Sequence, residues 1–324
     1  MSAVKNSRRM RLRLPATSAN LGPGFDAVAV ALDFFLEIEA EPAAEFSIRA
    51  SGRDADRCAR LDDNLVLDAY RHLLESQDRE VVPLAIRMAN GIPLGMGCGS
   101  SAAGRLAAIA MANHFGQLAW DTERIIDEGH RLEGHPDNVA ACWRGGLVAA
   151  ACHAGHVQVA QVEPPEQWRA IVVLPAHPLA TSEARAVLPA AFPREDVVTN
   201  IQSVALLGLA FAQGRGELLR AAMNDRVHQP YRAPFCPLLE PLMPLVGSDG
   251  ILGVALSGAG PAVLVVVESA AHVPGASEAI RRVAQQVQAP ELLVSRFLPG
   301  RQCDVFEAET SRDLADCGAQ RGLV

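Results

Sequence analysis

Residues 93–103 decide the fold of this chain, and they read Pro93-Leu94-Gly95-Met96-Gly97-Cys98-Gly99-Ser100-Ser101-Ala102-Ala103. The glycines at alternate positions let the backbone take positive φ angles and come close to a ligand. The residues that follow, up to His114, are rich in Ala and Leu and predict a helix, with Gly116 as its stop. Free N–H groups and the dipole at the start of a helix favour an anion. The stretch therefore predicts an anion-binding loop that opens a helix.

The serines at the end of this loop add hydroxyl groups that can donate to a phosphate or bind Mg²⁺. The loop lacks the Lys of G-x-x-x-x-G-K-[ST], and it lacks the last glycine of G-x-G-x-x-G. Taken alone, a flexible turn capped by serines explains the loop as well as a nucleotide site does.

Two further polar segments are candidates for a substrate site. Pro15–Asp26 contains Asn20, which can both donate and accept, and ends at Asp26, which can bind an ammonium group. His135-Pro136-Asp137-Asn138 gathers polar side chains before an apolar segment. Read singly, the first segment is an ordinary turn between strands, and His135 is a structural histidine bonded to backbone.

A glycine-rich turn and two arginines complete the candidates. Ser257-Gly258-Ala259-Gly260-Pro261 lies between two apolar segments, and a tight turn explains it, although it would also let backbone approach the first loop. Arg185 and Arg232 are of the residue type that grips a carboxylate in two-pronged fashion. Each arginine taken singly is typical of a surface charge.

Strand and helix patterns alternate along the whole chain. Apolar and polar periodicity predicts strands at 28–40, 83–88, 168–174, 251–256, 262–267 and 291–297. It predicts helices at 64–76, 102–114, 121–132, 181–187, 200–212, 216–223 and 277–287. Because consecutive strands occur, we expect an α+β fold. The Pro-rich residues 163–167 suggest a linker, which divides the chain into domains 1–163 and 164–324.

Composition excludes several classes of protein. The chain has 324 residues, 49% of them hydrophobic and 20% charged, as expected for two globular domains. A net charge of -8 argues against a nucleic-acid partner. Seven cysteines without a C-x-x-C pair argue against a disulfide framework or a zinc site, so we expect a reducing, cytoplasmic location. We expect no signal peptide and no membrane segment, because no apolar run approaches about 20 residues.

Together, and in order along residues 11–300, these segments resemble the GHMP small-molecule kinases. Residues 93–103 resemble the phosphate loop of that family, written P-x-x-x-G-L-G-S-S-A-A, and Ser257–Pro261 resembles its third motif. Pro15–Asp26 and Glu133–Ala140 resemble blocks of the homoserine kinase branch. Thr181–Arg185 and Pro230–Arg232 also have counterparts in that branch.

The resemblance implies a fold and a nucleotide. The N-terminal domain is expected to resemble domain 2 of ribosomal protein S5, and the C-terminal domain is expected to be ferredoxin-like. ATP is expected to bind at Asn64, Pro93, Leu94, Gly95, Met96, Gly97, Cys98, Gly99, Ser100, Ser101, Ala102, Ala103, Gly258 and Gly260. Asn64 is expected at the adenine.

The resemblance also implies the acceptor, L-homoserine, whose side-chain hydroxyl would be phosphorylated to O-phospho-L-homoserine on the route to threonine. The residues expected at the reacting centre are Asn20, Asp26 and Asn138. The residues expected to bind the rest of homoserine are His135, Asp137, Arg185 and Arg232, with the two arginines on its carboxylate. Phosphoryl transfer asks mainly for positioning and charge neutralisation, so no strong base is required.

Three positions depart from the family pattern. Cys98 stands where a leucine is usual, and Arg105 follows the small residues of the loop. Arg131 stands where the resemblance implies the carboxylate that binds Mg²⁺, so Glu133 or Glu128 would have to replace it. The expected metal ligands are Ser100, Ser101 and Glu133.

Two alternatives remain at this point. The chain could be another GHMP kinase that acts on mevalonate or a sugar, or a catalytically silent relative that binds a metabolite, as Arg131 would allow. The arginine pair and the segment 135–138 favour an amino-acid acceptor. A homodimer is the expected oligomer only because dimers are the commonest.

Overall fold

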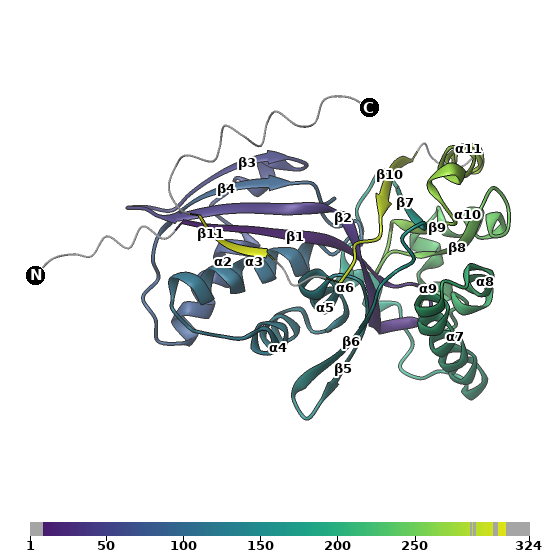
Figure 1. Cartoon of the computed structure of the whole chain (residues 1–324), viewed down its shortest axis with the longest axis horizontal. Helices are drawn as coiled ribbons and strands as arrows, with labels where there is room; N and C mark the ends of the chain where they lie inside the picture. Colours follow the sequence, from purple (N-terminus) through teal and green to yellow (C-terminus); the bar gives the residue numbers. More distant parts are fainter. Residues whose placement is uncertain (1–8, 286, 288–289, 301–303, 309–324) are drawn as a thin grey trace, which may run out of the picture.

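Two β-sheets form the framework of the protein in this computed structural model, which describes residues 9–285, 287, 290–300 and 304–308 (Figure 1). The first sheet has the strand order β11-β1-β2-β4-β3, with β5 paired to β2 and β6 paired to β5. The second sheet has the order β10-β7-β9-β8. Helices accompany both sheets, so the predicted α+β class is confirmed.

The strands of the first sheet are β1 Arg9–Asn20, β2 Gly24–Pro42, β3 Ser47–Gly52, β4 Leu84–Asn90, β5 Leu147–His153, β6 His156–Val162 and β11 Asp304–Ala308. Those of the second sheet are β7 Arg169–Leu174, β8 Ile251–Leu256, β9 Val263–Val267 and β10 Glu291–Arg296. β11 pairs with β1, so the chain returns to the first sheet at its end. The division at residue 163 stays a prediction, and β11 lies on the first sheet rather than the second.

The helices before β7 are α1 Ala55–Cys58, α2 Leu65–Ser76, α3 Ser100–Phe115, α4 Thr122–Glu133 and α5 Asp137–Arg144. Those after it are α6 Thr181–Ala186, α7 Arg194–Gln213, α8 Leu219–Ala222, α9 Gln229–Arg232, α10 Leu239–Leu242 and α11 Val273–Ala284. Short 3₁₀ turns lie at Gly216–Leu218, Ala233–Phe235, Met243–Leu245 and Ala270–His272. Among the described residues, none of these helices has both the length and the apolar character that a bilayer crossing requires.

Helix α3 lies in the centre of the first core. Its residues from Ala102 to Ala112 are almost all buried, and it contacts α2, α4, α5 and β1. Small side chains allow this close packing, since a Cβ on Gly104 would lie 3.2 Å from Leu65. The core therefore fixes the direction of α3 and the position of its first residue.

Strand β7 joins the two hydrophobic cores. Its side chains alternate, because Ala170 and Val172 belong to the core of the first half, whereas Ile171 and Val173 belong to a second core under α10 and α11. The second sheet is thus covered on both faces, and one of its faces is shared with the first half of the chain.

Some element boundaries differ from the prediction. Helix α7 begins at Arg194, before the predicted start at residue 200. Glu195 and Asp196 favour the start of a helix, but they are polar, so apolar periodicity does not detect this first part of α7. Helix α11 begins at Val273 and ends at Ala284, before the expected end at residue 287. The N-cap of α6 is Ala180, which makes no side-chain cap hydrogen bond. The hairpin of β5 and β6 was not predicted.

Candidate active site

A cavity of about 420 Å³ is lined by loops from both halves of the chain. These are the turn between β1 and β2, the loop before α3, the starts of α3 and α5, and residues of α6, α9 and the 257–261 turn. The site residues predicted from sequence that line it are Asn20, Asp26, Asn64, Leu94, Gly95, Gly97, Gly99, Ser100, Ser101, Glu133, His135, Asp137, Asn138, Arg185, Arg232 and Gly258. The candidate segments, which lie far apart in the sequence, therefore meet at one cavity.

The glycine-rich loop is held by backbone hydrogen bonds on two sides. Its glycines 95, 97 and 99 have φ angles of 70°, 79° and 72°, which favour glycine. Thr17 N donates to the carbonyl of Cys98 at 3.1 Å, and Ala262 N donates to the carbonyl of Met96 at 3.3 Å. The loop is fixed between β1 and the 257–261 turn.

Two of these glycines have no room for a side chain. A Cβ on Gly97 would overlap the carbonyl oxygen of Ser257, and a Cβ on Gly99 would overlap Thr17 Oγ1. Both the φ angle and the close approach therefore require glycine at positions 97 and 99.

The start of α3 offers unused backbone donors. The first helical hydrogen bond runs from Ala103 N to the carbonyl of Gly99 at 3.0 Å. The N–H groups of Ser100, Ser101 and Ala102 precede it and have no partner inside the helix. Gly99 is the N-cap and has no side chain to cap them. Since Ser100 and Ser101 line the cavity, this end of α3 suits a bound anion.

Asn20 holds the turn that carries Asp26. Asn20 and Asp26 have φ angles of 70° and 55°, a region that Asn and Asp tolerate better than most residues. The side-chain oxygen of Asn20 accepts from Asp26 N at 3.1 Å, and its nitrogen donates to the carbonyl of Gly258 at 2.8 Å. One N–H of the amide remains for a ligand.

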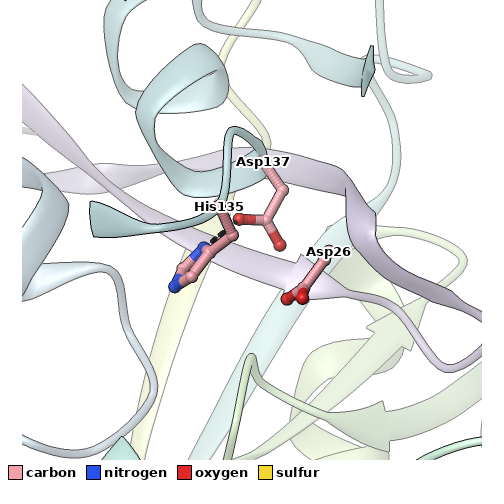
Figure 2. A group of neighbouring side chains, drawn as sticks. All are labelled: Asp26, His135 and Asp137. Atoms are coloured by element: carbon pink, nitrogen blue, oxygen red, sulfur yellow. Dashed lines mark hydrogen bonds and ion pairs between the residues drawn. The ribbon is translucent and has the colours of Figure 1, made fainter. Parts of the chain in front are cut away.

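The start of α5 forms the acidic side of the cavity (Figure 2). Asp137 Oδ1 lies 2.7 Å from His135 Nδ1 and accepts from Asn138 N at 2.6 Å. Asn138 Oδ1 accepts from the hydroxyl of Thr17 at 2.6 Å. Figure 2 shows Asp26 beside His135 and Asp137, and one ligand atom from each of the three lies within 4.8 Å of the others.

Two arginines face this acidic side. Arg185 donates to Asp26 from both terminal nitrogens, at 3.0 and 2.6 Å, and this contact raises the pKa of Arg185. Arg232 is buried, and burial, with Arg185 nearby, lowers its pKa to about 10. Arg232 therefore keeps its charge at neutral pH. Both guanidinium groups lie over the ring of Phe25, at 5.5 and 5.3 Å from its centre.

Known proteins are similar to this chain in sequence and in fold. The family pattern described as GHMP kinases N terminal domain matches residues 64–146, and that described as GHMP kinases C terminal matches residues 209–286. A curated homoserine kinase of Solibacter usitatus is 45% identical over 258 residues, which cover 79% of this chain and 84% of that protein. The chain belongs to the GHMP kinase family.

Other GHMP kinases support this assignment. A curated homoserine kinase of Deinococcus radiodurans is 37% identical over 80% of this chain and 84% of its own length. A solved structure of a putative homoserine kinase from Listeria monocytogenes has a TM-score of 0.74 at 25% identity, covering 93% of this chain and 100% of that one. The mevalonate kinase of L. major, at 16% identity and a TM-score of 0.69 over 92% of this chain and 99% of its own, shares the fold. The predicted GHMP kinase fold is confirmed, and with it ATP and a small-molecule substrate.

One carboxylate of this GHMP kinase could bind a metal beside the loop. Glu133 Oε2 lies 3.0 Å from Ser101 Oγ, and Arg105 contacts both side chains. A hydroxyl and a carboxylate are the oxygen ligands that Mg²⁺ prefers, so these residues fit that ion. Glu128 instead pairs with Arg131 at 2.5 Å and does not line the cavity. Of the two carboxylates considered, the geometry favours Glu133.

The group of Asp26, His135 and Asp137 fits a metal less well. Asp26 is already bound by both terminal nitrogens of Arg185, and Asp137 Oδ1 by a ring nitrogen and a backbone N–H. Mg²⁺ prefers oxygen ligands, and one of the three ligand atoms here is an imidazole nitrogen. An ammonium group donates hydrogen bonds, so it suits these carboxylates better once Arg185 releases Asp26.

Some predicted residues support the cavity without lining it: Pro93, Met96, Cys98, Ala102, Ala103 and Gly260. Burial raises the pKa of Cys98 to about 12, so its sulfur is a neutral thiol. Asn64 lines the cavity, but its side chain caps α2 by accepting from Val66 N and Leu67 N. A contact between Asn64 and adenine stays a prediction.

The structure adds residues that the sequence did not single out. Thr17, His228 and Asn200 each contact the site residues or the turn that carries them. Thr17 lay inside a quoted motif without an assigned role. Asn200 lies in α7 and His228 lies just before α9, and nothing in their spacing indicates that they meet the 20–26 turn.

Proposed function

We propose that this protein transfers the γ-phosphoryl group of ATP to the side-chain hydroxyl of L-homoserine, giving O-phospho-L-homoserine and ADP in threonine biosynthesis. One observation carries the proposal: a single cavity joins the anion-binding start of α3 to a cluster of opposite charges spaced for an amino acid. The homoserine kinases that match this chain over four fifths of its length support the choice of acceptor.

The nucleotide half of the cavity has a polar and an apolar part. The loop 93–99 and the first N–H groups of α3 would hold the triphosphate. Apolar side chains at the other part of the lining suit a base: Leu36, Leu65, Val66, Met88 and Ile92. ATP in this orientation presents its γ-phosphate at the α3 start, close to Asn138.

The acceptor half suits a zwitterion. Asp26 and Asp137 would bind the ammonium group of homoserine, with His135 orienting Asp137. Arg232, and Arg185 once it releases Asp26, would bind the carboxylate. The remaining end of homoserine is its hydroxyl, which then points toward the phosphate half of the cavity.

Transfer depends on alignment of the two substrates. Phosphoryl transfer through a loose transition state requires little help from a base, so Asn20 and Asn138 act as positioning groups for the hydroxyl. Ser100, Ser101 and Glu133 would hold Mg²⁺, which neutralises charge on the phosphates when bound. Arg105 contacts this same carboxylate and hydroxyl and therefore competes with the ion for them.

The alternative that the chain is a catalytically silent relative loses its main support. It depended on Arg131 at a metal position, but Arg131 pairs with Glu128 and does not line the cavity, whereas Glu133 does. Mevalonate has a carboxylate but no ammonium group, so it would leave the Asp26 side unpaired. A cytoplasmic location and a homodimer stay predictions.

The proposal is tested by ADP release from purified protein with ATP and Mg²⁺, using homoserine, mevalonate and galactose side by side. We expect homoserine alone to raise ADP release above the acceptor-free rate. Equal rates with all three, or a higher rate with mevalonate or galactose, would refute homoserine as the acceptor.

A further inference from the structure

His228 lies between the two charged parts of the acceptor site. It is fully buried, immediately before α9, which carries Arg232. One ring nitrogen, Nε2, lies 2.8 Å from the carbonyl oxygen of Gly22, in the turn that leads to Asp26. The other, Nδ1, lies 3.1 Å from NH1 of Arg232. One imidazole ring thus contacts both the arginine and the turn.

These contacts fix the protonation of the ring. A carbonyl oxygen only accepts, so Nε2 must carry a proton and donate to Gly22. A guanidinium only donates, so Nδ1 must be unprotonated and accept from Arg232. The ring is therefore neutral, with its proton on Nε2. Burial lowers the pKa of His228, which agrees with a neutral ring.

The ring itself is held from several sides. Asp225 Oδ2 accepts from His228 N at 3.0 Å and from Gln229 N at 2.6 Å, which fixes the backbone before α9. Phe25 stacks on the imidazole with the ring centres 5.4 Å apart. The position of the ring is thus independent of any ligand.

Arg232 depends on this ring for its orientation. Its Nε donates to the carbonyl of Ala184 at 2.9 Å, and NH1 donates to His228. Two contacts at different nitrogens define the plane of a guanidinium group, because the group is rigid and flat. The other N–H groups stay available at the cavity that Arg232 lines.

The turn at Gly22 cannot shift independently. A Cβ on Gly22 would overlap the carbonyl of Met223, and Asn200 donates to the carbonyl of Pro23 at 2.7 Å. A contact from His228 to Gly22 therefore ties Arg232 to a fixed part of the turn that carries Asp26.

We propose that His228 is a positioning residue which, as the neutral Nε2–H tautomer, orients Arg232 toward the carboxylate of the acceptor and ties it to the Asp26 turn. This inference rests on the proposed function. His228 does not touch the reacting atoms, so its effect should fall on acceptor binding rather than on ATP binding.

Two substitutions separate the polar contacts from the packing. His228→Phe keeps a ring against Phe25 but removes both hydrogen bonds, whereas His228→Gln supplies an acceptor and a donor. We expect His228→Phe to raise the KM for homoserine about 10- to 100-fold with the KM for ATP unchanged, and His228→Gln to recover most of this loss.

A truncated acceptor tests whether the effect passes through Arg232. 3-Aminopropan-1-ol is homoserine without its carboxylate, and it is measured as a substrate or as a competitive inhibitor. We expect wild type and His228→Phe to bind it equally, so that the loss appears only with homoserine. Equal losses with both compounds, or a raised KM for ATP, would indicate a general structural role and overturn the proposal.

The tautomer is tested in the wild-type protein, whether or not the variants fold. In ¹⁵N-labelled protein at neutral pH, we expect the histidine cross-peak pattern of a ring protonated at Nε2 only, and a shift of the Nδ1 signal when homoserine binds. A doubly protonated pattern contradicts the inference. Failure of wild type to phosphorylate homoserine would instead refute the proposed function, without changing the tautomer measured.

Discussion

Asp26 and Arg185 neutralise each other across the cavity by two hydrogen bonds of 3.0 and 2.6 Å. These are the charges that we assign to opposite ends of a zwitterion. The amino acid must therefore enter between them, exchanging one internal ion pair for two pairs with the substrate. Because the replaced pair is half-exposed, this exchange costs little, and it selects ligands that carry both charges.

Glu133 is the residue on which metal binding depends in this account. We expect Glu133→Gln to raise the Mg²⁺ concentration needed for half-maximal activity about tenfold, because it removes the carboxylate charge beside Ser101. Calorimetry of Mg²⁺ binding to the ATP complex should show the same shift without turnover. Glu128→Gln is the matched control, and its Mg²⁺ dependence should equal that of wild type. The reverse result would make Glu128 the ligand.

His228 also predicts a dependence of stability on pH. Burial lowers the pKa of His228 in the folded protein. The Arg232 guanidinium also lowers it, whereas the carboxylate of Asp225 raises it without reversing the direction. The unfolded chain, with a histidine pKa of about 6.5, then binds a proton that the folded protein does not. The contribution is complete above about pH 6.5 and is lost as pH falls, and the loss at pH 5.5 is at most about 1.4 kcal/mol.

Urea unfolding at pH 7.5 and 5.5 measures this loss. We expect the free energy of unfolding of His228→Gln to fall less than that of wild type between these values, by up to about 1.4 kcal/mol. An identical fall in both proteins would show that His228 is not held neutral.

The loop before α3 is the element on which nucleotide binding depends. We expect Gly97→Ala to cost at least about 3 kcal/mol of stability and to abolish ATP binding, because its Cβ would overlap the carbonyl of Ser257. Gly155→Ala is the matched control: it has φ 83° but open space, so it should cost only about 1 kcal/mol. Thermal unfolding and ATP calorimetry measure both, and equal costs would refute a steric role for Gly97.

Elements with strong local signals could be predicted from the sequence. Helix α3 follows from its Ala and Leu content, and α4 from Asp121, whose side chain accepts from Arg124 N as an N-cap should. The site segments could be found as motifs, but not how they use their side chains. Asn64, for example, is expected at the adenine from the resemblance, whereas in the structure its side chain caps α2.

Elements whose stability comes from distant contacts could not be predicted. Helix α5 begins inside the polar segment 135–138, where Asn138 accepts from the hydroxyl of Thr17 in β1, a contact that apolar periodicity does not indicate. The β5–β6 hairpin depends on β2 as a partner. The role of His228 could not be predicted from local patterns for the same reason, since its contact with Gly22 depends on tertiary packing.

At the scale of the whole molecule, the two halves are joined around strand β10. Arg53 and Glu291 form a two-pronged ion pair, and Arg296 donates to Asp33 at 2.6 Å. Strand β7 adds a shared hydrophobic core. Because the cavity takes lining from both halves, these contacts also fix the distance between the nucleotide and acceptor sites.

The return of β11 to the first sheet gives a prediction at this scale. A chain that ends at residue 300 lacks β11 and leaves the backbone of Arg9–Arg13 in β1 unpaired on one side. We expect its Tm to lie about 2 °C or more below that of a chain ending at residue 308. Calorimetry of the two chains decides this, and equal Tm values would show that β11 adds no stability.

The central claim is that one cavity aligns ATP with an amino-acid hydroxyl, and a crystal structure with a non-hydrolysable ATP analogue, Mg²⁺ and homoserine tests it most directly. We predict the triphosphate at the start of α3, the homoserine ammonium at Asp26 and Asp137, its carboxylate at Arg232, and its hydroxyl toward the γ-phosphate. Homoserine bound elsewhere, or bound with its carboxylate toward the phosphates, would contradict the account.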